Sequence, residues 1–298
     1  MADTAVTEPG SDLQLRQLAA RHGLKVAGSR PSLGVYTRQL WQYRNFITEY
    51  ANAKLVAAFS TARLGQLWQV LTPLANAGVY YLIFGVVLNT RSQVDNFIAY
   101  LCTGLFVFTF TQTVVQQGTQ SIVANLGLIR ALHFPRAVLP ISVMLTQFQS
   151  LIAAMVVLIG IVLVSGEPIT IEWLLLIPTL LLQSVFNAGL ALAMARLGAK
   201  LTDLKQVMPF VMRTWMYGSG VLYSVANFED HLSPLASNII EANPLLVYIE
   251  LARHALMEDV PLASPVGQLW AYAIGWTVVI GIGGYIYFWR GEQEYGRG

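Results

Sequence analysis

Charge is scarce in this 298-residue chain, because only 11% of its residues are Asp, Glu, Lys or Arg, against about 25% in an ordinary soluble domain. Hydrophobic residues make up 55% of the chain, and the mean hydropathy is +0.54. So few charges cannot cover the surface of a soluble globule of this size. The composition therefore excludes an ordinary cytosolic enzyme, a disordered chain and a fibrous repeat, and it predicts an outer surface that faces lipid.

Cysteine and catalytic motifs are also nearly absent. Cys102 is the single cysteine, which excludes an intrachain disulfide and a cysteine-rich metal site. The sequence contains no P-loop and no metalloprotease, dithiol or nucleophile-elbow motif. A histidine metal site is disfavoured because the four histidines lie far apart in the sequence, at His22, His133, His231 and His254.

Six long apolar runs are present, each long enough to cross the roughly 30 Å hydrocarbon core of a bilayer as a helix. None has an acidic residue or a histidine in its interior, which disfavours a proton-coupled transporter. The runs are continuous rather than alternating, which favours helices over the strands of a membrane barrel. We expect spans at about residues 68–88, 97–115, 138–164, 173–194, 207–225 and 269–289.

The N-terminal segment and the basic residues predict the orientation. Residues 1–30 contain no apolar stretch of the kind found in signal peptides, so we expect the N-terminus to stay in the cytoplasm. Fifteen of the eighteen Lys and Arg residues then fall on the inside, and the outer loops hold only Arg91 and Arg253. This asymmetry follows the positive-inside rule. It predicts a multi-pass inner or plasma membrane protein with both termini, including the tail 291–298, in the cytoplasm.

Two segments precede the first span. Residues 1–33 are polar, with Gly and Pro, and are expected to form a mobile cytoplasmic tail. Residues 34–60 are typical of an amphipathic helix in the membrane interface, and the alternative is packing against a soluble partner or the chain's own cytoplasmic loops. The apolar face of this helix contains Tyr36, Leu40, Tyr43, Ile47 and Tyr50, and its polar face contains Arg38, Gln42, Asn45, Glu49 and Asn52.

Two loops are expected on the cytoplasmic side. In the first, Asn125 can cap a short helix that Pro135 ends. The residues between them are too apolar to remain in water, so we expect this helix to insert into another structure. The second loop, 199–206, is short and basic, and Asp203 is expected to cap a helix or form a charge pair there.

The last outer loop, about residues 226–267, contains two helix start signals. Ser233–Pro234 and Asn243–Pro244 each place a capping residue before a proline at the first helical position. The predicted helices, about 234–241 and 244–257, are too short to span. We expect re-entrant or interfacial helices, and the alternative is ordinary packing helices on the outside.

Polar and aromatic residues inside two spans are candidates for a substrate path. Arg213 lies about 10 Å along its span, where a charge is expected to face a cavity or pathway; the alternative is that its side chain extends to the inner headgroups. Aromatic rings can stack on sugars, whereas helix packing and interface anchoring are the alternatives. The other candidates are Trp215, Tyr217 and Tyr223 in the fifth span and Phe106, Phe108 and Phe110 in the second, where Thr109, Gln112, Gln116 and Gln117 also occur.

Four stretches of the chain carry a family resemblance. They are LGQLWQVLTPLANAGVYYLIFGVVL at 64–88, YLCTGLFVFTF at 100–110, NLGLIRALHFPRAVLPIS at 125–142 and NPLLVYIELARHALM at 243–257. They resemble the ABC-2 type permeases that export cell-surface polysaccharides, such as the O-antigen exporter permeases. The resemblance extends over about residues 36–290. More narrowly, the chain looks like actinobacterial permeases that export the lipid-linked galactan of the cell wall.

The resemblance implies the fold and the partners. The fold would be an all-α polytopic membrane protein of the ABC-2, type V exporter kind, with six transmembrane helices within residues 61–290. Such permeases form homodimers that pair with two separate nucleotide-binding ATPase subunits. The partner subunits would hold ATP and Mg²⁺, and this chain would have no cofactor, metal or catalytic residue of its own. Membrane lipid and lipid-linked polysaccharide are further partners, and no nucleic acid is expected.

The resemblance also implies three sets of functional residues. An external gate would include Pro234, Asn243, Pro244 and Tyr248. The substrate channel would contain Phe106, Phe108, Phe110, Arg213, Trp215, Tyr217 and Tyr223, with Arg213 placed to meet the pyrophosphate of a polyprenyl-linked substrate. Coupling to the ATPase would involve Leu126, Leu128, Ile129, Arg130, Leu132, His133, Phe134, Pro135, Arg136 and Asp203.

The sequence thus predicts a permease subunit that exports lipid-linked cell-surface polysaccharide, of the O-antigen or galactan type, by ATP hydrolysis in a separate subunit. Two alternatives remain at this point. One is an ABC-2 permease for another cargo, such as a teichoic acid or a drug. The other is a membrane enzyme or scaffold without transport activity.

Overall fold

A computed structural model describes residues 31–60, 65–87, 96–225 and 234–295 of the chain. Most of the predicted tail 1–33, the start of the last outer loop (226–233) and the final residues 296–298 lie outside the described residues. Within the described ranges the regular structure is entirely helical. The elements are α2 (Leu33–Gln42), α3 (Arg44–Ser60), η1 (Gly65–Leu67), α4 (Trp68–Tyr80), η2 (Tyr81–Val87), α5 (Phe97–Gln120), η4 (Val123–Asn125), α6 (Leu126–Ala131), α7 (Val138–Val164), η5 (Ile171–Leu175), α8 (Leu176–Lys200), α9 (Leu204–Tyr217), α10 (Pro234–Glu241), α11 (Pro244–Leu256) and α12 (Val266–Arg290).

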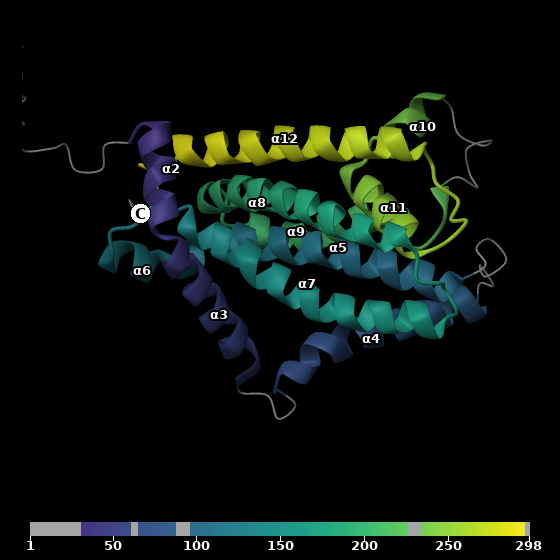
Figure 1. Cartoon of the computed structure of the whole chain (residues 1–298). Helices are drawn as coiled ribbons and strands as arrows, with labels where there is room; N and C mark the ends of the chain where they lie inside the picture. Colours follow the sequence, from purple (N-terminus) through teal and green to yellow (C-terminus); the bar gives the residue numbers. More distant parts are fainter. Residues whose placement is uncertain (1–30, 61–64, 88–95, 226–233, 296–298) are drawn as a thin grey trace, which may run out of the picture.

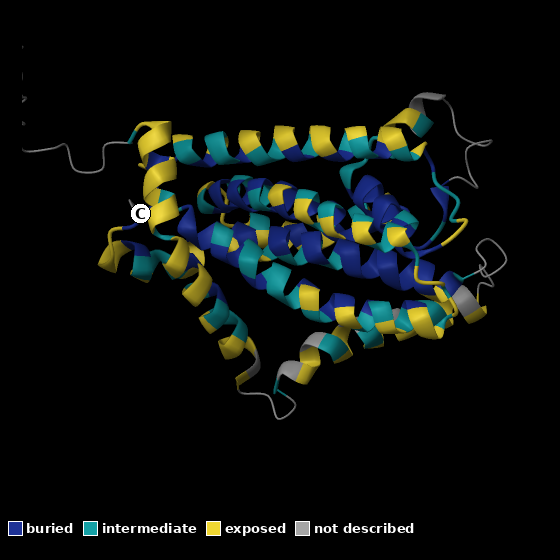
Figure 2. Cartoon of the chain, in the orientation of Figure 1, coloured by how far each residue is buried: buried dark blue, intermediate teal, exposed yellow. Residues whose placement is uncertain are grey.

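The long helices form one bundle with α5 at its centre (Figures 1 and 2). Among the described residues, four helices are long and apolar enough to cross a membrane: α5, α7, the continuous helix Ile171–Lys200, and α12. They contain the predicted second, third, fourth and sixth spans. The first predicted span, 68–88, corresponds to α4 followed by the π-helical turn η2.

The predicted fifth span, 207–225, is wrong in its second half. Helix α9 ends at Tyr217, and the chain continues as an irregular segment through Gly218 and Gly220. Gly220 has φ +60°, a left-handed conformation that ends helical geometry and that glycine adopts without a steric penalty. A stretch apolar enough to span the bilayer is therefore broken by its own glycines.

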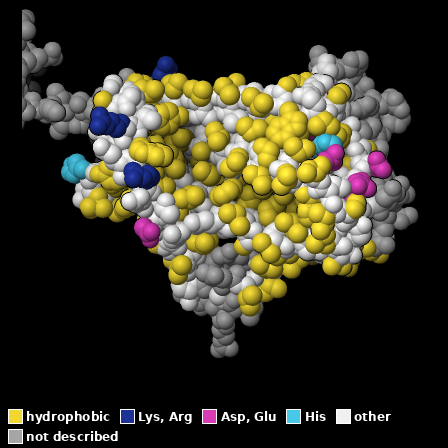
Figure 3. All heavy atoms as spheres, in the orientation of Figure 1, with side chains coloured by type: hydrophobic (Ala, Val, Ile, Leu, Met, Phe, Trp, Pro, Cys, Tyr) yellow, Lys and Arg dark blue, Asp and Glu magenta, His cyan; other side chains and the backbone are white. Residues whose placement is uncertain are grey.

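The bundle has two chemically different ends (Figure 3). We call them the α6 end, where α2, α6 and the last described residues lie, and the α10 end, where α10 lies (Figure 1). On the visible face, Lys and Arg side chains lie toward the α6 end, most Asp and Glu side chains lie toward the α10 end, and apolar surface separates them. This separation agrees with the charge asymmetry of the sequence.

The predicted helix 34–60 is two helices, α2 and α3, with a break at Tyr43. Its apolar face is placed as the sequence predicts, because Tyr36 and Ile47 are buried. That face packs against the chain's own Phe134 and Phe288, which is the alternative that the sequence left open. Trp41 is 69% exposed on the other side of α2, where it can anchor this helix in a membrane interface.

Candidate functional site

The predicted coupling segment is a short helix with one inward and one outward face. Helix α6 spans Leu126–Ala131, and Leu132 is already extended, so the helix ends before the predicted limit at Pro135. Ile129 and Phe134 are buried in the chain's own cluster at the α6 end. In contrast, Leu132 is 50% exposed. Arg130 and His133 are exposed, and Leu126, Leu128 and Arg136 are half-buried, while Pro135 is buried.

The predicted cap of this helix is wrong. Asn125 does not cap α6 with its side chain. Its Nδ2 donates to the Ser121 carbonyl at 2.7 Å, and its Oδ1 accepts from the Tyr50 hydroxyl at 2.7 Å. The Tyr43 hydroxyl also donates to the His133 carbonyl at 3.1 Å. The Asn125 side chain therefore holds the start of the segment against α3 by binding Tyr50, instead of capping α6.

A buried carboxylate after the last helix holds this region together, and the sequence analysis missed it. Glu292 is 4% exposed. Its Oε2 accepts from the Tyr36 hydroxyl at 2.7 Å, and its Oε1 accepts from the backbone N–H of Arg136 at 2.9 Å. The Ala137 N–H in turn donates to the Tyr36 hydroxyl at 3.2 Å. We call these three contacts the Glu292 clamp, because they join α2, the end of the coupling segment and the C-terminal turn.

The electrostatics of the Glu292 clamp follow from its burial. Burial raises the pKa of the Glu292 carboxyl, and hydrogen bonds from Arg136 and Tyr36 oppose this shift by stabilising the charged form. Burial likewise raises the pKa of Tyr36, so its hydroxyl stays protonated and can donate. The sequence signal for this carboxylate was an acidic residue between basic and aromatic residues in the predicted cytoplasmic tail 291–298.

Replacing Glu292 by alanine is expected to destabilise the α6 end. The change leaves the Tyr36 hydroxyl and the Arg136 N–H without their acceptor, and each unsatisfied buried group costs about 1–3 kcal/mol. Glu294→Ala is the matched control, since Glu294 is exposed and pairs with Lys200 on the surface at 3.1 Å. Thermal unfolding of the purified protein should show a clear decrease in Tm for Glu292→Ala and little change for Glu294→Ala. Equal melting temperatures for the two variants would contradict the clamp.

The second predicted contact, Asp203, lies next to this region. Its side chain is exposed but does not cap α9, so the predicted cap is wrong. The adjacent surface is hollowed by a pocket of about 220 Å³ that includes Gln120, Thr202 and Lys205. Asp203 and the α6 segment thus share one end of the bundle.

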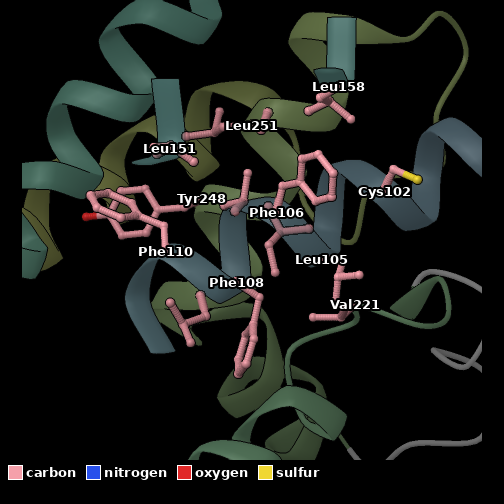
Figure 4. Close-up of a cluster of buried hydrophobic side chains, with 14 of the residues drawn as sticks. Cys102, Leu105, Phe106, Phe108, Phe110, Leu151, Leu158, Val221, Tyr248 and Leu251 are labelled. Atoms are coloured by element: carbon pink, nitrogen blue, oxygen red, sulfur yellow. The ribbon is translucent and has the colours of Figure 1, made fainter. Parts of the chain in front are cut away.

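The predicted channel aromatics of α5 lie inside the protein. Phe106, Phe108 and Phe110 are 2%, 0% and 3% exposed, and they belong to the main core (Figure 4). Phe108 has no exposed surface with which to contact a sugar. Phe106 and Phe110 still line part of a groove of about 240 Å³ between α4, α5 and α7.

The residues predicted on the fifth span lie on different sides of it. Arg213 and Tyr217 are on the exposed face of α9, and Trp215 is half-buried. The Trp215 indole N–H donates to Asn243 Oδ1 at 3.0 Å. Tyr223, beyond the break, donates its hydroxyl to the Tyr217 carbonyl at 2.7 Å. The structure therefore brings a predicted channel residue, Trp215, into contact with a predicted gate residue, Asn243.

The predicted outer helices are confirmed in position as α10 and α11. Asn243 caps α11 by accepting from the Leu245 N–H at 3.1 Å, and Pro244 is the first helical residue. Asn243 Nδ2 also donates to the Gly218 carbonyl at 2.8 Å. Helix α10 begins at Pro234. Tyr248, a predicted gate residue, is 0% exposed and packs in the core (Figure 4).

Helix α11 carries a buried arginine that the sequence analysis placed in an outer loop. Arg253 is 0% exposed, and its guanidinium lies 3.3 Å from the centre of the Tyr100 ring. It donates to the carbonyls of Tyr100, Gly220 and Val221 at 3.2, 2.9 and 3.0 Å. Arg253 and Asn243 therefore hold the broken segment after α9 against α11.

Among the described residues, no three His, Cys, Asp or Glu side chains lie close enough together to hold a metal ion. The structure assembles the α6 segment, the Glu292 clamp, a groove and a broken helix.

Comparison with known proteins identifies the relatives. A family model described as ABC-2 type transporter matches residues 50–257. The O-antigen export system permease protein RfbA of Myxococcus xanthus is 26% identical over 238 residues, covering 80% of this chain and 90% of that protein. A protein of the same description from Klebsiella pneumoniae is 28% identical over 210 residues, covering 70% and 79%. The polysialic acid transport protein KpsM of Escherichia coli is 26% identical, covering 67% and 76%.

Proposed function

Since this chain belongs to the ABC-2 type transporter family, we propose that it is the membrane permease of an ATP-driven exporter of lipid-linked cell-surface polysaccharide. The observation that carries the proposal is its similarity to O-antigen export permeases over most of both chains. The sequence has no P-loop, so the energy would come from a separate ATPase subunit that binds ATP and Mg²⁺. The permease itself would be a homodimer with two such subunits.

The proposed orientation places the α6 end in the cytoplasm, together with both termini. The excess of basic residues on the predicted inner segments supports this orientation. Arg130, Leu132 and His133 would then be presented to the ATPase, while Ile129 and Phe134 anchor the segment to the permease. The Glu292 clamp would transmit movement of the segment to α2 and α12. Arg213, exposed on α9, would meet the pyrophosphate of the cargo lipid.

The cargo can be tested by depleting the protein in cells. Lipid-linked polysaccharide should then accumulate on the inner leaflet, and surface polysaccharide should decrease. Analysis of the accumulated lipid-linked glycan would also show whether it is a galactan or another polymer. Unchanged lipid-linked glycan, with loss of teichoic acid export or of drug efflux instead, would reject the polysaccharide cargo.

The proposed coupling surface predicts that Leu132→Asp weakens binding of the ATPase subunit about tenfold or more. A carboxylate at this position would have to lose its water on docking, and about 1.4 kcal/mol corresponds to a tenfold change in affinity. Ile169→Asp is the control, because Ile169 is 74% exposed in the loop between α7 and η5, at the opposite end of the bundle. Co-purification and titration with the ATPase subunit measure the effect. If Leu132→Asp retained full affinity for the ATPase subunit, this segment would not be part of the interface.

A further inference from the structure

Between Leu101 and Gln120, helix α5 has one incompletely buried face, and that part of the face is made entirely of neutral polar residues. From Leu101 to Gln120 every side chain is buried except six. These six are Thr109, Gln112, Thr113, Gln116, Gln117 and Gln120. At 3.6 residues per turn they lie within an arc of about 140°. We call this face the α5 polar stripe.

A face of this composition does not suit a lipid environment. Hydrocarbon cannot hydrogen-bond to amide or hydroxyl groups, so polar side chains within a membrane face the protein interior or a water-filled space. The rest of α5 is covered by α7, α8, α9 and α11, and the polar stripe is the part that they leave incompletely covered. Helix α4 lies across from the Thr109 end of the stripe, on the other side of the groove. The exposed faces of α7 and α12 are apolar by comparison, with Val156 68% and Val279 61% exposed.

The groove described above lies along the polar stripe. Thr109 and Thr113 of the stripe line it, together with Thr72 and Asn76 of α4 and Gln147 and Ser150 of α7. Gln147 Nε2 donates to Gln117 Oε1 at 3.1 Å, which extends the polar surface toward the α6 end. At that end, Gln120 and Lys205 both line the pocket of about 220 Å³ near Asp203. The stripe thus connects a pocket at the α6 end with the groove between α4, α5 and α7.

The chemistry of the stripe selects a class of ligand. Its groups are amides and hydroxyls, which donate and accept hydrogen bonds and carry no charge. Such groups match the hydroxyl groups of sugars and give no strong site for an ion. Trp68 of α4, 44% exposed, adds aromatic surface to the groove wall, on which the apolar face of a sugar ring can stack.

We propose that the α5 polar stripe is the wall that contacts the sugar units of the exported chain, with hydrogen bonds from its amides and hydroxyls to the glycan. This inference rests on the proposed function and changes the predicted channel lining. The aromatics of α5 pack behind the stripe, and the polar residues between them face the cargo. A second copy of the chain, hydrogen-bonded to the stripe, is the competing occupant.

Cysteine labelling tests the proposal in the intact complex with its ATPase. Because Cys102 is the single cysteine, Cys102→Ser gives a cysteine-free background. Gln116→Cys should react with a charged, membrane-impermeant thiol reagent, and added lipid-linked glycan should slow the reaction severalfold. The control is Val156→Cys, on the exposed apolar face of α7, which should react slowly with or without glycan.

The outcomes separate the possibilities. A Gln116→Cys that is as unreactive as Val156→Cys shows a dry, covered face and overturns the proposal in favour of a protein interface. Rapid labelling without protection by glycan shows a hydrated face that the cargo does not contact, and it also overturns the proposal. Failure of the unmodified complex to export glycan rejects the proposed function itself, independently of the labelling.

A kinetic readout distinguishes cargo contact from a structural role. Thr113→Val combined with Gln116→Leu should raise the glycan concentration needed for half-maximal export several-fold, without changing the amount of assembled complex. Gln268→Leu, an exposed glutamine on α12, should change neither quantity. An unchanged half-maximal concentration in the double variant would contradict the proposal.

Discussion

Arg253→Met is expected to remove most of the folded protein from the membrane fraction. The side chain is fully buried and supplies the hydrogen-bond donors for the carbonyls of Tyr100, Gly220 and Val221. Methionine fills a similar volume but donates nothing. The Tyr100 carbonyl lies within α5 and keeps its helical donor. Each buried acceptor left without a donor costs about 1–3 kcal/mol, so the Gly220 and Val221 carbonyls together approach the lower end of the net stability of about 5–15 kcal/mol of an ordinary protein.

The membrane setting increases this effect. Non-helical backbone at membrane depth is tolerated only where protein groups or a water-filled cavity satisfy its polar atoms. In the proposed membrane orientation the segment after α9 is such backbone, and Arg253 and Asn243 are the side chains that donate to its carbonyls at Gly218, Gly220 and Val221. Without the guanidinium, the segment must find water or rearrange.

Two further variants make the test specific. Arg253→Lys keeps the charge but loses the planar fork of donors, so its stability should lie between those of the wild type and Arg253→Met. Arg290→Met removes an exposed arginine at the end of α12 and should change little. Membrane abundance and thermal unfolding in detergent measure the series. If Arg253→Met melts within a few degrees of Arg290→Met, the carbonyls have other donors and the argument fails.

The sequence predicted the elements that depend on local signals. A continuous apolar run predicted residues 138–164, and α7 has these bounds. Asn243 followed by Pro244 predicted a capped helix start, and α11 begins there with the asparagine cap. In both cases the information lies within a few residues, so no knowledge of distant neighbours was needed.

Prediction from the sequence was wrong where a residue's environment depends on another helix. Arg253 was placed in an outer loop, but it is 0% exposed. Arg213, expected to face a cavity or the inner headgroups, is exposed on α9. Arg253 needs space beside Gly104, where an added Cβ would lie 2.5 Å from its Nη2. A pairing between residues so far apart along the chain leaves no local pattern, although Glu250 and Arg253 within an apolar helix are a usable signal of burial.

In the candidate site, too, one part of the information is local and the other part depends on neighbouring helices. The sequence contains the α5 polar stripe as polar residues spaced three or four apart, at 109, 113, 116 and 120. The predicted channel lining consisted of the aromatics between them, because aromatic rings stack on sugars. Only the packing of α7, α8 and α11 around α5 shows which face is covered, and it covers the aromatics.

Gly284→Val is expected to separate α12 from α8 and to destabilise the bundle strongly. The two helices touch through glycines: a Cβ on Gly284 would overlap the Gly189 carbonyl, and a Cβ on Gly189 would overlap the Ile280 carbonyl. Membrane helices associate through close packing of small residues, because lipid supplies no hydrophobic drive between them. Since the obstacle is backbone, no rotamer change can make room, and overpacking costs at least about 1–3 kcal/mol.

The neighbouring glycine provides the control. A Cβ on Gly283 meets nothing within 4 Å, so Gly283→Val changes the composition of α12 equally without a clash. Thermal unfolding should therefore show a large decrease in Tm for Gly284→Val and little change for Gly283→Val. Similar melting curves for the two variants would contradict the close packing of α8 and α12.

The same pair of variants tests whether α12 positions the coupling region. Glu292 follows α12 directly, so a displaced α12 should pull the carboxylate away from Tyr36 and Arg136. Gly284→Val should then weaken ATPase-subunit binding, Glu292→Ala should have the same effect, and Gly283→Val should leave the binding unchanged. If Gly284→Val lowers the Tm but keeps full affinity for the ATPase subunit, the Glu292 clamp does not transmit the position of α12. The segment from Leu126 to Pro135 would then be held in place by α2 and α3 alone.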